Sequence, residues 1–138
     1  MALSIIIEAK EEDRLKILHS ALCNGWNEML HFGLECDYDG DDYAAARDTL
    51  IAAGNTAEEL CFEDILIQLV RNGKAITVSD IELGDEPEVV GYLSLANLNA
   101  NWDKAPARIL LAYINGEDDA WTAVDFMQVI SMGEITRG

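Results

Sequence analysis

Basic residues are scarce in this sequence. Nine lysine and arginine residues stand against 26 aspartate and glutamate residues in 138, which gives a formal net charge of −17 at pH 7. Proteins that bind nucleic acid directly neutralise phosphates with Lys and Arg, and anionic membranes attract the same cationic surfaces. The composition therefore excludes a generic binder of the nucleic-acid backbone and argues against docking to a membrane.

Long apolar runs and paired cysteines are also missing. No stretch approaches the ~20 apolar residues that a membrane span needs, and the first apolar run stops at Glu8 without basic residues before it, so we expect no signal peptide. Cys23, Cys36 and Cys61 are odd in number and lack the Cys-x-x-Cys spacing of a zinc site. We expect reduced thiols in a cytoplasmic protein, each a small core residue.

The remaining composition is that of an ordinary globular domain. Half of the residues are hydrophobic and 25% are charged, which suits one buried core and argues against disorder. A chain of 138 residues leaves little room for two domains. We therefore expect residues 1–138 to form a single domain.

The hydrophobic pattern of the first half predicts alternating strands and helices. Residues 3–9 are typical of a short β-branched strand, and residues 11–22 carry an apolar stripe at helical spacing that Asn24-Gly25 ends. From residue 26 to residue 38 the apolar residues fall mostly on even positions, which predicts one strand with a solvated face.

Helix signals then follow one another. The acidic turn at residues 37–42 precedes a predicted helix of about a dozen residues that Gly54-Asn55 ends. Thr56 and Glu59 have the spacing of a capping box, which predicts the start of a helix that runs to Arg71. Asn72-Gly73 would close that helix.

The second half predicts a hairpin and then helices. Residues 75–83 and 89–93 are typical of two strands joined by a polar loop. Ser94 is placed to cap a short helix, Pro106 suits a first turn, and Asp118 or Asp119 can cap a last helix that Gly133 ends. The sequence therefore predicts an α+β fold: a small, mostly antiparallel sheet, about five or six helices and a helical C-terminal third.

Three stretches carry a family resemblance: residues 21–26, residues 62–80, and the ending in which Gln128 is followed by Gly133, Glu134, Ile135 and Gly138. In this order they resemble small proteins of unassigned function that are encoded by phages and prophages. The Gln-x4-Gly-Glu-Ile-x-x-Gly ending is the most specific part. The resemblance implies a phage protein in the cytoplasm of a bacterial host, and it brings no catalytic residues.

Motifs for metal or catalytic chemistry are incomplete. Asp37, Asp39 and Asp41 match the start of a calcium loop, but Asp42 stands where that loop needs glycine and Asp48 where it needs glutamate. His19 and His31 lack a serine–histidine or cysteine–histidine signature, and a zinc site would need a third ligand from a distant acid or cysteine. Phosphate-binding glycine motifs are absent. We predict no enzyme, no cofactor and no metal.

Acidic clusters provide the first candidate site. Acids gather at residues 35–42, 58–64, 80–88 and 117–119, and if several share a face they could imitate the phosphates of a duplex. A counter-defence inhibitor would then occupy the nucleic-acid-binding site of a host protein. The predicted contact residues are Asp37, Asp39, Asp41, Asp42, Glu58 and Glu59. A solvated acidic surface remains the alternative for each cluster.

Sparse bases near an aromatic residue provide the second candidate. Arg71 and Lys74 precede the predicted hairpin, and Arg108 follows Trp102 closely. Arginine forks grip phosphate and an indole can stack on a base, so these residues could hold a small phosphorylated nucleotide immune signal at a pocket or oligomer interface. The alternatives are that Arg71 complements a helix dipole and that Trp102 is an ordinary core residue. A structural or regulatory phage protein without a defence role is a third possibility.

Overall fold

The first long helix is where the sequence predicts it. The computed structural model describes residues 8–82 and 84–137. Helix α1 (Glu11–Gly25) opens with three acidic residues, which suit its positive end, and buries Leu15, Leu18 and Leu22. The strand predicted over residues 3–9 falls mostly outside the described residues, and residues 8–10 form no strand.

The strand predicted over residues 26–38 is wrong for its first eight residues. Trp26 keeps helical backbone angles, the 3-10 turn η1 (Glu28–Phe32) follows, and the chain reverses at Gly33, whose φ of 73° is a left-handed conformation. Within η1 the alternation fails, because Met29 is buried while Leu30 is 45% exposed. Only β1 (Leu34–Asp37) is extended, with alternate residues buried and exposed.

Two helices follow β1. Helix α2 (Gly40–Ala52) is capped by Asp39, and α3 (Phe62–Arg71) ends before Gly73, whose φ is 83°. The predicted Thr56–Glu59 capping box is wrong: these residues flank and form the 3-10 turn η2 (Ala57–Glu59), in which the Thr56 side chain makes no capping hydrogen bond. The helix begins later, where the carboxylate of Asp64 accepts a 3.2 Å hydrogen bond from the Cys61 N–H.

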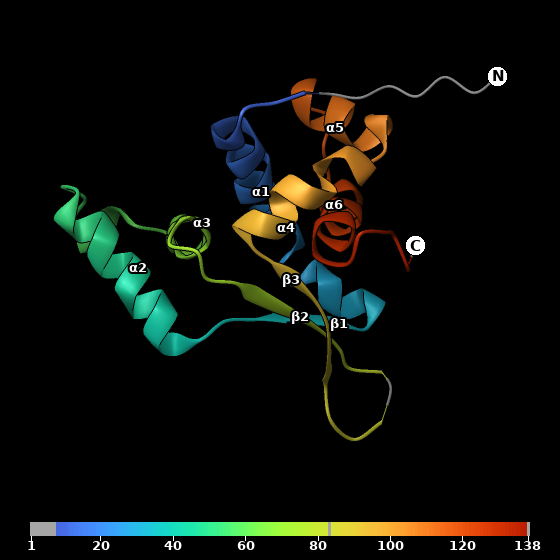
Figure 1. The fold of residues 1–138 in the computed structure, drawn as a ribbon, viewed down its shortest axis with the longest axis horizontal. Helices are drawn as coiled ribbons and strands as arrows, with labels where there is room; N and C mark the ends of the chain where they lie inside the picture. Colours follow the sequence, from blue (N-terminus) through green and yellow to red (C-terminus); the bar gives the residue numbers. More distant parts are fainter. Residues whose placement is uncertain (1–7, 83, 138) are drawn as a thin grey trace.

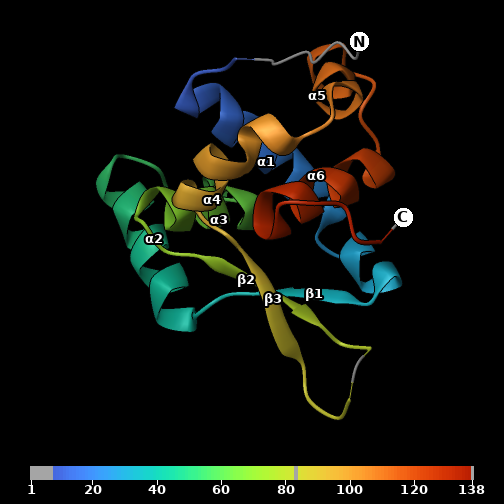
Figure 2. The same ribbon diagram turned by 45° about the vertical axis from the view of Figure 1, so that its right-hand side comes forward.

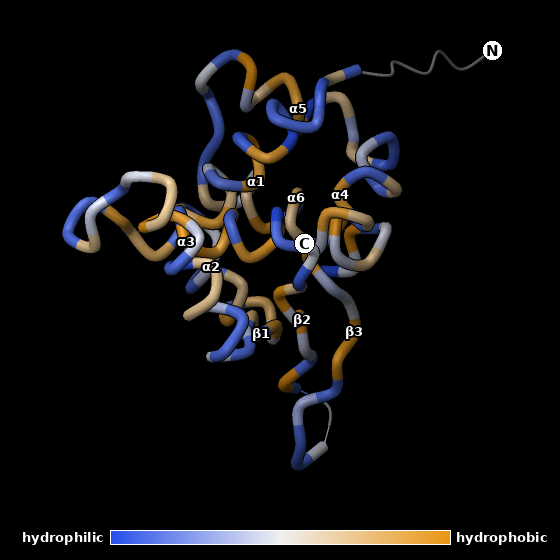
Figure 3. Tube along the Cα trace, turned by 60° about the vertical axis from the view of Figure 1, so that its left-hand side comes forward, coloured by the Kyte–Doolittle hydropathy of each residue, from blue (hydrophilic) through white to orange (hydrophobic). Residues whose placement is uncertain are grey.

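The predicted hairpin is confirmed. Strands β2 (Ile76–Asp80) and β3 (Glu88–Leu93) pair antiparallel, and β1 pairs antiparallel with the other edge of β2, giving the order β1-β2-β3. The loop between β2 and β3 extends away from the helices, and its tip is hydrophilic (Figures 1 and 3). One face of the sheet is buried against helices through Leu34, Cys36, Ile76, Val78 and Leu93.

The C-terminal third is helical, as predicted. Ser94 caps α4 (Leu95–Asn101), and the turn η3 (Trp102–Lys104) and helix α5 (Ala107–Ile114) follow. Asp119 caps α6 (Ala120–Met132) by accepting a 2.9 Å hydrogen bond from the Thr122 N–H. Gly133, with φ 83°, ends α6.

Helix α6 lies at the centre of the core. It packs against α1, α4 and β3, and its buried residues are Ala123, Val124, Phe126, Met127, Gln128, Val129, Ile130 and Ser131 (Figures 1 and 2). Gly91 lets the β3 backbone approach α6, because a Cβ atom at this position would lie 2.4 Å from the Ser131 carbonyl oxygen. The described residues thus form an α+β fold with six α-helices and a three-stranded antiparallel sheet.

The C-terminal tail is fixed to this core by two side chains. The buried amide of Gln128 donates to the Arg137 carbonyl at 2.8 Å and accepts from the backbone N–H groups of Thr136 and Arg137. The Arg137 guanidinium forms an ion pair with Asp80, a buried carboxylate at the end of β2. None of the helices in the described ranges has the length and apolar character needed to span a bilayer.

Candidate functional site

A row of carboxylates runs along β1 into α2. The alternation of β1 exposes Glu35 and Asp37, and the extended backbone continues to Asp39. Residues two apart on an extended strand are separated by about 6.7 Å, so these side chains form a regularly spaced series. Because Leu34 and Cys36 hold the opposite face of β1 in the core, the direction of the carboxylates is fixed.

The first turn of α2 extends this row. One carboxylate oxygen of Asp39 accepts hydrogen bonds from the Asp41 N–H at 2.9 Å and the Asp42 N–H at 3.1 Å. Asp39 therefore has a structural task as the N-cap, whereas Asp41 is exposed and Asp42 is partly exposed beside it. Asp37 accepts from the Tyr38 N–H at 2.8 Å and stays on the surface.

The other two predicted contact residues lie elsewhere. Glu58 and Glu59 belong to η2, which follows the far end of α2 (Figure 1). Both are exposed, and Glu59 lines a pocket between helices. The six acidic residues chosen from the sequence therefore form two groups at opposite ends of α2.

A further set of acids lies on the β2–β3 loop. In Figures 1 and 2 this loop and the first turn of α2 lie at opposite ends of β1, because Leu34 pairs with Asp80 beside the loop, whereas Asp37 leads into α2. Residues 34–60 hold eight acidic residues and one basic residue, and residues 80–88 hold five acidic residues and no basic one. We call the carboxylate row on β1 and the first turn of α2 the acidic end: Glu35, Asp37, Asp39, Asp41 and Asp42.

The basic residues chosen from the sequence do not gather at one place. Arg71, at the end of α3, grips Glu12 of α1 through both guanidinium nitrogens, one of them at 2.8 Å. This pairing lowers the pKa of Glu12 and raises that of Arg71. Arg108 of α5 lies 3.4 Å from Asp125, and Lys74 is exposed in the turn before β2.

Trp102 is a core residue. Only 1% of it is exposed, its ring packs edge-on against Phe126, and the Arg14 guanidinium lies 5.3 Å from the ring centroid. The prediction that Trp102 stacks on a base beside Arg71 and Arg108 therefore needs correction, because the residue is almost completely buried in the core. The four residues proposed for a nucleotide site do not form one.

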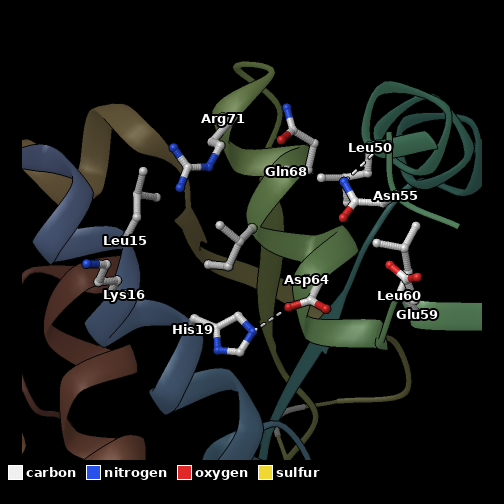
Figure 4. Close-up of a pocket in the computed structure, with 11 residues that line it drawn as sticks. Leu15, Lys16, His19, Leu50, Asn55, Glu59, Leu60, Asp64, Gln68 and Arg71 are labelled. Atoms are coloured by element: carbon white, nitrogen blue, oxygen red, sulfur yellow. Dashed lines mark hydrogen bonds and ion pairs between the residues drawn. The ribbon is translucent and has the colours of Figure 1, made fainter. Parts of the chain in front are cut away.

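Arg71 does line a pocket between helices. This pocket of about 410 Å³ lies between α1, α3 and the segment that leaves α2 (Figure 4). Leu15 and Ile67 form an apolar wall, and the polar groups are Lys16, His19, Asn55, Glu59, Asp64, Gln68 and Arg71. The pocket therefore combines both signs of charge.

His19 of α1 and Asp64 of α3 face each other at the edge of this pocket (Figure 4). The His19 Nε2 atom is 2.9 Å from an Asp64 carboxylate oxygen, and the Cys23 Sγ atom is 3.8 Å from His19 Nδ1. Cys61 joins them from the start of α3, and donor atoms of His19, Cys61 and Asp64 all lie within 4.8 Å of one another. These are residue types that hold metal ions.

The cysteines differ from their predicted burial. Cys36 is a core residue and burial raises the pKa of its thiol to about 12, but Cys23 and Cys61 are exposed. The spacing of His19 with Cys23, and of Cys61 with Asp64, would have placed each pair on one helical face. That the two faces meet depends on how α1 packs against α3, which local pattern does not reveal.

The order Cys23, His19, Asp64 matches that of a cysteine–histidine–acid triad, but its electrostatics do not. Partial burial first, and then the nearby carboxylates Glu63 and Asp64, raise the pKa of the Cys23 thiol. A nucleophilic cysteine needs an electropositive setting that stabilises the thiolate. Hydrogen bonds from Cys61 and His19 hold the pKa of Asp64 low, which favours the ionised form of its carboxylate.

Comparison with known proteins adds no relative to this description. No protein-family model, curated protein or solved structure matches the chain significantly. The interpretation of the site therefore depends on its own geometry: an acidic end built on β1 and α2, and a mixed pocket with a His–Cys–Asp cluster at its rim.

Proposed function

We propose that the chain is a non-catalytic, phage-type binding protein whose acidic end occupies the nucleic-acid-binding site of a host defence protein. The observation that supports this most is the carboxylate row on β1 and the first turn of α2. The row is directed outward by the buried residues of β1, and one basic residue, Arg47, accompanies it between residues 34 and 60.

The chemistry of such an interaction follows from charge. A basic channel that binds phosphates is attracted to any rigid surface with closely spaced negative groups, and this attraction speeds association at low salt. Exposed charges are screened over about 8 Å at physiological ionic strength, so binding should weaken steeply as salt rises. In this proposal the protein acts in the cytoplasm of the bacterial host and binds no nucleic acid itself.

Charge reversal at the acidic end is expected to abolish partner binding. The substitutions are Glu35→Lys, Asp37→Lys and Asp41→Lys in one variant, which spares the N-cap Asp39 and so preserves the start of α2. Immobilised wild-type protein should retain a DNA-binding host protein from lysate of defence-carrying cells, and duplex DNA or added salt should release it. We expect the affinity of the variant for that protein to fall at least about 100-fold, because attraction becomes repulsion.

The matched control reverses three exposed acids elsewhere: Asp103→Lys, Glu117→Lys and Glu134→Lys. This variant has the same net charge as the first and should keep most of the affinity. Equal binding by both variants would contradict the proposal, as would a retained partner that duplex DNA does not displace.

A second candidate function rests on the pocket beside Arg71. A small phosphorylated nucleotide could contact Arg71, Lys16 and His19 there, although Glu59 and Asp64 share the lining and Arg71 would have to leave Glu12. Binding of a nucleotide in this pocket would be less sensitive to salt than binding through exposed surface charges.

Calorimetric titration with cyclic mononucleotides and dinucleotides tests this second function. If the pocket sequesters such a signal, one of these ligands should bind, and Arg71→Ala should weaken it at least about tenfold by removing a charge-assisted phosphate contact. Arg108→Ala serves as the control outside the pocket. Unchanged affinity in Arg71→Ala, or no binding by any ligand of the series, would exclude this function.

A further inference from the structure

Three potential metal ligands converge where α1 meets α3. His19 comes from the third turn of α1, Cys61 is the N-cap residue of α3, and Asp64 lies one turn into α3. One donor atom from each residue lies within 4.8 Å of the other two. In Figure 4 the imidazole of His19 and the carboxylate of Asp64 point at each other across the edge of the pocket.

The separation of these atoms is close to that of a zinc site. Bond lengths of about 2.0–2.3 Å in a tetrahedral site place neighbouring ligand atoms about 3.3–3.8 Å apart. The His19 and Asp64 atoms are already 2.9 Å apart, and the Cys61 sulfur, within 4.8 Å of both, has to approach by at most about 1 Å to reach this range. An imidazole, a thiolate and a carboxylate together are a donor set that favours Zn²⁺.

If His19 binds a metal ion through Nε2, its other ring nitrogen, Nδ1, already has a neighbouring polar atom. The Cys23 sulfur, one helical turn further along α1, lies 3.8 Å from His19 Nδ1. Zinc-bound histidines usually hold their other ring nitrogen in a hydrogen bond, which fixes the orientation of the ring. Cys23 can fill this position, so we count it as an orienting residue and not as a ligand.

The acidic surroundings of the cluster favour a cation over a reactive thiol. The Cys61 thiol lies beside the carboxylates of Asp64 and Glu63. A divalent cation would be attracted to these carboxylates, and a thiol that coordinates such an ion loses its proton. Lys16 also lines the pocket, together with Arg71, whose charge is compensated by Glu12.

We propose that His19 Nε2, Cys61 Sγ and the Asp64 carboxylate bind one Zn²⁺ ion that joins α1 to α3, with the fourth position open to water. The bound ion would hold together two helices whose ligands, His19 and Cys61, are 42 residues apart in the sequence. This site is independent of the acidic end and of the partner proposed for it.

Metal titration of the untagged 138-residue chain tests the proposal. Native mass spectrometry should show one Zn²⁺ per chain, and Co²⁺ should give visible absorption with a thiolate-to-cobalt charge-transfer band that Zn²⁺ removes. We expect Cys61→Ser to abolish the charge-transfer band. Cys61→Ser and His19→Ala should each weaken Zn²⁺ binding at least about tenfold. Loss of a residue that only orients a ligand lowers metal affinity about 10–100-fold, and loss of the ligand itself should cost at least as much.

Matched variants separate this site from adventitious binding. His31→Ala removes the other histidine, which is exposed and pairs with Glu28, and Cys36→Ala removes the buried thiol; both should bind Zn²⁺ as the wild type does. Cys23→Ser should keep the charge-transfer band. Serine is a good N-cap residue, so Cys61→Ser should fold, and far-ultraviolet circular dichroism checks this.

A second measurement does not depend on affinity. In the Cys23→Ser background Cys61 is the exposed thiol, and saturating Zn²⁺ should slow its alkylation at least about tenfold. The proposal is overturned by the absence of stoichiometric Zn²⁺ or Co²⁺ binding, by unchanged binding in a folded Cys61→Ser variant, or by an alkylation rate that Zn²⁺ does not alter.

Discussion

Replacing Arg137 with alanine is expected to lower the free energy of unfolding by about 3 kcal/mol. Its guanidinium pairs with Asp80, whose side chain is 3% exposed, so the substitution removes the opposite charge from a buried carboxylate. Asp80 still accepts a 2.8 Å hydrogen bond from the Glu82 N–H, which places the cost at the lower end of the range for broken buried pairs. Urea denaturation followed by tryptophan fluorescence measures the change.

Two further variants identify the cause of that loss. Arg137→Lys retains the positive charge and should recover part of the stability, although it cannot reproduce the planar fork. Adding Asp80→Asn to Arg137→Ala removes the buried charge, and the double variant should be more stable than Arg137→Ala alone. A denaturation midpoint for Arg137→Ala equal to that of the wild type would show that the ion pair contributes nothing to stability.

Alanine at Gly91 is expected to destabilise the protein by about 3 kcal/mol, the upper part of the usual range for overpacking. A Cβ atom there would lie 2.4 Å from the Ser131 carbonyl oxygen and 2.9 Å from the Met132 Cγ atom. The first contact involves the backbone of α6, which cannot rotate away as a side chain can. β3 and α6 would have to separate, and thermal unfolding monitored by circular dichroism would show the loss.

The control for this substitution is Gly40→Ala in the first turn of α2. Nothing lies within 4 Å of a Cβ atom at that position, and Gly40 does not have a positive φ. Alanine there should be neutral or stabilising by up to about 1 kcal/mol, because it reduces the entropy of the unfolded chain. Equal melting temperatures for the Gly40 and Gly91 variants would refute the close approach of β3 to α6.

Local signals predicted most of the elements correctly. Asn72-Gly73 and Gly133 end α3 and α6, while Ser94 and Asp119 cap α4 and α6 through their side chains. These signals are reliable because a cap or a left-handed glycine acts on its own helix end and needs no distant partner. The hairpin followed from the same kind of evidence.

The errors arose where two local interpretations competed. Residues 26–33 alternate in hydrophobicity as a strand does, yet Gly33 allows a left-handed turn and the preceding residues continue the helical conformation. Thr56 and Glu59 have the right spacing for a capping box, but Asp64 serves the helix start at Cys61. In each case the tertiary structure selects one of two patterns that the sequence permits.

Candidate sites were less predictable than elements. The acids at residues 35–42 were evident from composition, whereas their separation from Glu58 and Glu59 depends on the direction of α2 (Figure 1). The cluster of His19, Cys61 and Asp64 crosses from α1 to α3, and no spacing within either helix indicates that the two meet. Such a cluster becomes visible only when the packing of the helices is known.

The central place of α6 has a consequence for how the protein is made. The first described helix, α1, packs against α6, and the core around β3 also requires α6. During synthesis α1 and the sheet must therefore wait, with apolar surface uncovered, until α6 has emerged from the ribosome. The core is completed only then, when Arg137 can also reach Asp80.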